Sequence, residues 1–122
     1  MSGADVPLEG SGLTEAISAA MVALYARFYG HQRTTAKTYI NDDVVVCILV
    51  DILSVDETRL VSEGAAVQVM DGRIAFQTDT EDEFTAAVED LTHRRVVAFM
   101  SANQTSPGIA SELFFLEPRA AC

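Results

Sequence analysis

The sequence predicts an α+β fold in two layers, with the element order α-β-β-α-β-β and a four-stranded antiparallel sheet covered by two helices, the second very long. Three observations predict it. A chain of 122 residues with 49% hydrophobic content fits one domain around one core. Apolar residues recur at helical spacing in two segments, and four β-prone runs are joined in pairs by turn residues. We expect a single domain over residues 11–118, between a disordered tail at 1–10 and a short tail at 119–122.

The first helix is predicted from an apolar stripe near the N-terminus. We expect Ser11 or Thr14 to cap its start, and Gly30 to end it in a left-handed conformation. The residues of the stripe are Leu13, Ile17, Met21, Leu24 and Phe28.

A hairpin follows, with strands predicted at 34–40 and 44–50. The residues between them, Asn41-Asp42-Asp43, tolerate the positive φ of tight turns, and Asp51 closes the second strand. Asp51 is expected at the far end of that strand from Asp42 and Asp43, about 25 Å away, so the three carboxylates do not converge. We interpret them as turn and strand-end markers rather than as a metal or proton site.

A very long second helix is predicted over 55–92, opened by a capping box of Ser54 and Glu57. As one straight helix it measures about 57 Å, against strands of about 25 Å. Either it breaks near 78–82, or it overhangs the sheet and meets a second copy of the chain. We favour overhang with dimerisation. The candidate dimer residues of this helix are Leu60, Val67, Met70, Ile74, Phe84, Val88 and Leu91.

The last two strands are predicted at 94–102 and 109–117, with a polar loop between them. Loops on a rigid hairpin often bind ligands, so the segment 100–108 is a candidate ligand or partner loop. An ordinary long hairpin loop is the favoured interpretation of this segment. The candidate residues are Ser101, Asn103, Gln104, Thr105 and Ser106.

Charge and composition narrow the expected partners. The net charge of −10 repels nucleic acid and anionic lipid, so a basic protein face, a cation or the cytoplasmic loop of a membrane protein is favoured. The longest apolar run, 44–50, is too short to cross a bilayer, and the N-terminus does not resemble a signal peptide. We therefore expect a soluble, cytoplasmic chain without nucleic-acid binding or direct membrane insertion. Cys47 and Cys122 are not expected to pair, and neither zinc nor a cofactor is expected.

Candidate chemistry is sparse. The acidic segment 79–83 lacks the spacing of a calcium loop, so a solvated face is the favoured interpretation. His31 and His93 stand near helix ends without a nucleophile motif, and Arg94 is expected to complement a helix dipole or an acid. Arg73 is expected to snorkel or to pair with an acid. No catalytic residue is predicted.

An ordered series of motifs carries a resemblance to a known family. The motifs are "ALYARFYG", "AKTYINDDVVVCIL", "LSVDETRLVSEG", "FTAAVEDLT" and "VVAFMSANQTSPGIASELFFLEP". The series resembles the MpsC-like family, named for the soluble component of a Na+-translocating, membrane-potential-generating system. The resemblance implies a small soluble module that assists ion or bicarbonate handling at the membrane, and it supplies no catalytic residues. The chain departs from the family at 30–34, "GHQRT" instead of Gly-x-Gly-Pro, and at His93, where relatives have glycine.

Three functions stay open, in order of preference. The first is a non-enzymatic, homodimeric accessory or regulatory module for a membrane or signalling partner. The second is a small-molecule or ion-binding sensor that uses the 100–108 loop or the acidic segment. The third, a cryptic hydrolase or isomerase, requires a pocket that joins a histidine to an acid.

Overall fold

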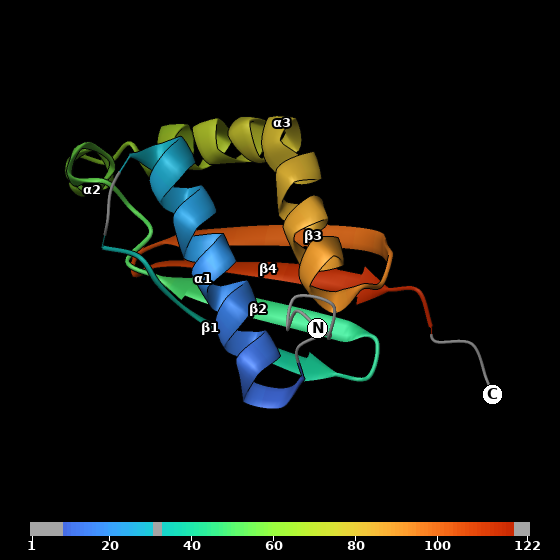
Figure 1. Ribbon diagram of the computed structural model, residues 1–122. Coiled ribbons are helices and arrows are strands. Elements are labelled where there is room, and N and C mark those ends of the chain that lie inside the picture. The colour runs from blue at the N-terminus through green and yellow to red at the C-terminus, as the bar shows by residue number, and fades with distance from the viewer. Residues whose placement is uncertain (1–8, 31–32, 119–122) are drawn as a thin grey trace.

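The computed structural model describes residues 9–30 and 33–118. The elements are α1 (Gly10–Tyr29), β1 (Thr35–Asn41), β2 (Val44–Val50), α2 (Val55–Ser62), α3 (Ala66–Thr92), β3 (Val96–Thr105) and β4 (Gly108–Leu116). The strands form one antiparallel sheet in the order β1-β2-β4-β3, and α1 and α3 lie on one face of it (Figure 1). The predicted two-layer α+β architecture is confirmed.

The core lies between this face and the helices, and strand periodicity selects the residues that fill it. Alternate residues of the two central strands point toward the helices and are buried, whereas their neighbours point to the other face. The buried core residues are Ile17, Met21 and Tyr25 of α1; Val45, Cys47 and Leu49 of β2; Ile52, which follows β2; Phe84 and Val88 of α3; and Ala110, Phe114 and Leu116 of β4.

Helix α1 ends as predicted and starts differently. Gly30 adopts φ 76°, and its N–H donates to the Ala26 carbonyl oxygen at 2.9 Å. The helix begins at Gly10, one residue before the predicted domain start, and the residue before it makes no side-chain cap bond. The expected cap by Ser11 or Thr14 is wrong, because both lie inside the helix and the Thr14 hydroxyl donates to the Ser11 carbonyl oxygen.

The first hairpin forms as predicted. Asn41 pairs with Val44, so Asp42 and Asp43 make a two-residue turn, in which Asp42 has φ 54°. Asp51 follows β2 at the far end of the strand with φ 57°. The aspartates occupy the turn and the strand end, as the sequence indicated.

The predicted helix over 55–92 is divided at 63–65 rather than near 78–82. Gly64 has φ 90°, a left-handed conformation that stops α2 after one short segment. Helix α3 then continues without interruption, but it turns sharply midway (Figure 1). Hydroxyls of Thr78 and Thr80 donate to carbonyl oxygens four residues earlier, at 3.1 and 3.0 Å, an arrangement that bends helices. A straight overhanging helix is therefore wrong.

The loop expected at 103–108 is also shorter than predicted. Strand β3 extends to Thr105, which pairs with Gly108, so only Ser106 and Pro107 form the turn. The polar residues of this segment alternate between the two faces of the sheet. The polar composition suggested a loop. However, polar side chains can alternate between the two faces of a strand just as apolar ones do.

Candidate functional site

A buried carboxylate lies at the centre of the molecule. Glu112 of β4 is 0% exposed and points toward the helices among core residues. The Tyr25 hydroxyl donates to Glu112 Oε1 at 2.7 Å, and Gln77 Nε2 donates to Oε1 and Oε2 at 3.1 and 3.2 Å. Gln77 Nε2 also contacts Ser101 Oγ. We call Tyr25, Gln77, Ser101 and Glu112, which join α1, α3, β3 and β4, the Glu112 cluster.

The surroundings of Glu112 bring the pKa of its carboxyl close to neutral pH. Burial raises the pKa of Glu112 to about 7, although the hydrogen bonds from Ser101, Tyr25 and Gln77 oppose the rise. Burial also raises the pKa of Tyr25, which therefore stays a donor. Glutamine and serine hold no charge, so Glu112 is the group in the cluster that gains or loses a proton around neutral pH.

A second polar arrangement attaches α2 to the rest of the fold. Arg73, 1% exposed, donates from Nε and Nη2 to the two Glu57 carboxylate oxygens at 2.9 and 2.8 Å, and from Nη2 to the Ile52 carbonyl oxygen. Its guanidinium carbon also lies 4.2 Å from the Tyr29 ring centroid. The expected pairing of Arg73 with an acid is confirmed.

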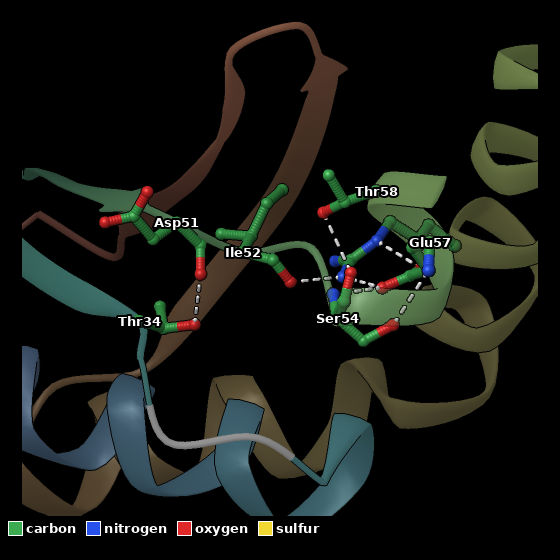
Figure 2. Close-up of polar contacts among 7 residues, drawn as sticks. Thr34, Asp51, Ile52, Ser54, Glu57 and Thr58 are labelled. Atoms are coloured by element: carbon green, nitrogen blue, oxygen red, sulfur yellow. Dashed lines mark hydrogen bonds and ion pairs between the residues drawn. The ribbon is translucent and has the colours of Figure 1, made fainter. Parts of the chain in front are cut away.

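The predicted capping box is part of the same arrangement (Figure 2). Glu57 N donates to Ser54 Oγ at 3.1 Å, and Ser54 N donates to Glu57 Oε1 at 3.0 Å. Burial raises the pKa of Glu57, but the bonds from Arg73 and Ser54 outweigh it and hold that pKa below its usual value. One carboxylate thus caps α2 and neutralises the buried guanidinium.

The structure separates the candidate ligand residues of the 100–108 segment. Ser101 faces the Glu112 cluster, and Asn103 Nδ2 donates to Gln77 Oε1 at 3.5 Å. Gln104 is exposed and donates to the Ser106 carbonyl oxygen at 3.3 Å. Thr105 and Ser106 line an open hollow of about 700 Å³ at that end of the sheet. The five residues therefore do not form one binding loop.

The candidate dimer residues are divided in the same way. Phe84 and Val88 are buried in the chain's own core, and Leu91 packs against it. Leu60 and Met70 are half-buried. Val67 and Ile74, in the first half of α3, are 73% and 53% exposed. The bend in α3 thus leaves only the first half of the stripe at the surface.

Four of the titratable candidates line an open groove of about 860 Å³ at the turn between β1 and β2. Asp42, Asp43, His93 and Arg94 all line it. Arg94 pairs with Asp43 and donates to the carbonyl oxygens of Asp42 and Glu117 at 3.1 and 2.9 Å. The His93 backbone N–H donates to the Glu89 carbonyl oxygen at 2.9 Å, as a helix end requires. Among residues 9–30 and 33–118, no set of three His, Cys, Asp or Glu side chains is placed to hold a metal ion.

His93 ends α3 with φ 57°, a left-handed conformation that glycine adopts most readily. The glycine expected there by resemblance therefore has a conformational explanation. His31 and Cys122 lie outside the described residues, and Cys47 is buried and free, where burial raises the pKa of its thiol to about 11.

Sequence reasoning missed the uncovered face of the sheet. The unbroken apolar run of β2 supplies apolar side chains to both faces of the sheet, yet the helices α1 and α3 lie on one (Figure 1). We call the side chains on the other face the outer sheet face. Its residues are Thr35, Lys37, Tyr39 and Asn41 of β1, Val44, Val46, Ile48 and Val50 of β2, Ile109, Ser111, Leu113 and Phe115 of β4, and Ala98, Met100, Ala102 and Gln104 of β3.

Within the described ranges, no helix combines the length and apolar content that crossing a bilayer requires. Comparison with known proteins finds a match over residues 11–118 to the family described as Na+-translocating membrane potential-generating system (MpsC). No curated protein and no solved structure matches the chain.

Proposed function

The chain belongs to the MpsC family, which indicates a component of a Na+-translocating, membrane-potential-generating system, and we propose that it serves this system as a non-enzymatic, homodimeric accessory protein. It acts on the cytoplasmic side by binding a membrane-embedded component. The binding surface is the first half of α3, and its occupant is a basic cytoplasmic segment of that component.

The observation that carries this proposal is an exposed stripe that combines two apolar residues with one acid. Val67, Asp71 and Ile74 follow at spacings of four and three, so they share one side of α3, and all three are exposed. The cytoplasmic segments next to membrane spans are enriched in lysine and arginine. Such a segment is attracted by the net charge of −10, while its apolar residues cover Val67 and Ile74.

The test is binding of the purified chain to vesicles that carry the membrane component of the system. We expect binding that weakens as salt rises, because exposed charges supply part of it. The variant Ile74→Lys removes an apolar contact and adds a repelling charge, so binding falls at least tenfold. Ala86→Lys, an exposed position in the second half of the same helix, is the matched control and leaves binding unchanged. Equal binding to vesicles with and without the component refutes the proposal.

A second candidate function, ion sensing, is favoured by the placement of Ser101 beside the buried Glu112. It is tested by thermal unfolding in Na+, K+ and choline chloride at equal ionic strength. A sensor is stabilised selectively by the ion that it binds, and Glu112→Gln abolishes this selectivity. Identical melting temperatures in the three salts rule the sensor out.

A further inference from the structure

One row of the outer sheet face is apolar in all four strands. The strand register aligns its side chains in rows, and the central row runs Tyr39–Val46–Leu113–Met100 through β1, β2, β4 and β3. At the two edges of this row, Tyr39 and Met100 are 56% and 54% exposed. The next row contains Val44 and Phe115 at its centre. A continuous apolar surface of this kind on a monomer marks an interaction site.

The charges of the chain lie elsewhere. Glu112 is the one acid within the bounds of the four strands, and it points toward the helices. Lys37, on β1, is the one charged residue of the outer sheet face. A basic partner therefore finds no countercharge on this surface, whereas the stripe on α3 contains the exposed Asp71. A second copy of the chain, by contrast, approaches it without bringing acids into direct opposition.

The size of the face is sufficient for a specific interface. Four strands about 4.8 Å apart, each about 27 Å long, cover about 500 Å² per copy in projection, and two copies about 1,000 Å². This is the size at which specific protein–protein interfaces begin. Two apolar sheet faces also have a known way to pack, about 10 Å apart with strands nearly aligned.

We propose that a second copy of this chain covers the outer sheet face, so that two sheets stack face to face about a two-fold axis with the helices outside. The central rows of the two copies form the middle of the interface. This inference shares the homodimer with the proposed function, but it assigns the dimer contact to the sheet. The first half of α3 stays free for the membrane component.

The first experiment is light scattering on the purified chain over a concentration series. We expect twice the chain mass of 13.1 kDa at high concentration. Met100→Lys places a charge at the interface and shifts the dimer dissociation constant at least a hundredfold upward. Ile74→Lys, at a position of matched exposure on α3, leaves it unchanged. Circular dichroism establishes that each variant is folded, and Tyr39→Lys repeats the test from the opposite edge strand.

A second measurement needs no substitution. Peroxide oxidises exposed methionines, so Met100 is oxidised slowly in the dimer and at least tenfold faster after dilution to monomer, as mass spectrometry of its peptide measures. Equal oxidation rates at both concentrations overturn the inference.

The outcomes also separate this inference from the proposed function. A chain that stays monomeric at all concentrations contradicts the homodimer in both this inference and the proposed function. A dimer that Ile74→Lys dissociates and Met100→Lys does not assigns the contact to α3 and overturns the sheet interface. A monomer that floats with vesicles of neutral lipid assigns the outer sheet face to a membrane instead. If the chain forms the dimer but does not bind vesicles that carry the membrane component, only the proposed function is contradicted.

Discussion

Replacing Glu112 by glutamine removes the buried proton site and keeps its shape. The carboxyl is 0% exposed and accepts hydrogen bonds from Tyr25 and Gln77, and the groups of Arg73, Ser101 and Cys47 surround it from α3, β3 and β2. Glutamine is close in shape to the protonated carboxyl, and its amide oxygen still accepts from the Tyr25 hydroxyl. The variant therefore behaves as a protein whose residue 112 is neutral at every pH.

The direction of the effect follows from the pKa. The folded-state pKa of Glu112 is about 7, above its ordinary value of 4.5. The folded protein therefore holds this proton more tightly than the unfolded chain does. The stabilisation is fully present below pH 4.5 and is lost as the pH rises through 7. At about 1.4 kcal/mol per pH unit, the wild type loses roughly 2 to 3 kcal/mol of unfolding free energy from this group between pH 5 and pH 8.5.

The assay is urea unfolding of the wild type and Glu112→Gln at half-unit steps from pH 5 to pH 8.5. Other groups titrate equally in both proteins, so the difference between the two unfolding free energies isolates Glu112. We expect the variant to gain roughly 2 to 3 kcal/mol relative to the wild type across this range. Glu81→Gln, at an exposed position of α3, serves as the control and gives a constant difference. A difference for Glu112→Gln that changes by less than about 0.5 kcal/mol would refute the reasoning, because the carboxyl would then titrate as it does in the unfolded chain.

Three further substitutions test the local structure. Arg73→Met leaves the partly buried Glu57 without its cation and lowers the unfolding free energy by about 3 kcal/mol; a loss below 1 kcal/mol by urea unfolding contradicts the pairing. Ser54→Ala removes the capping hydroxyl of α2 and lowers the unfolding free energy by about 1 kcal/mol. Ser62→Ala, at the other end of α2, is the control, and equal losses of stability from both variants contradict the cap. His93→Gly relieves a left-handed residue at the end of α3 and raises stability by about 1 kcal/mol; a lower melting temperature contradicts this.

The sequence predicted those features that a single local rule determines. Hydrophobic periodicity placed α1, the capping box placed the start of α2, and the Asn-Asp-Asp turn placed the first hairpin. The division at Gly64 was within reach, because glycine favours the left-handed conformation. It was missed because the apolar spacing continues across it, and the apolar residues beyond it serve the chain's own core.

The candidate site depended on contacts between distant segments. Tyr25, Gln77 and Glu112 are separated by up to 87 positions, and each is unremarkable in its local sequence. One signal was present, since Glu112 interrupts an apolar strand at an inward position of the period-two pattern. The outer sheet face was visible as the run of seven apolar residues in β2, but sequence alone does not say which layers cover a sheet.

Helix α2 contributes no buried residue to the core, and the Arg73–Glu57 pair and the capping bonds attach it to the rest of the chain. Segments with so little buried surface open locally long before the whole protein unfolds. We therefore expect the amides of residues 55–62 to exchange with deuterium far faster than those of β2 and β4. The eight-residue helix can therefore open locally while the sheet keeps its structure.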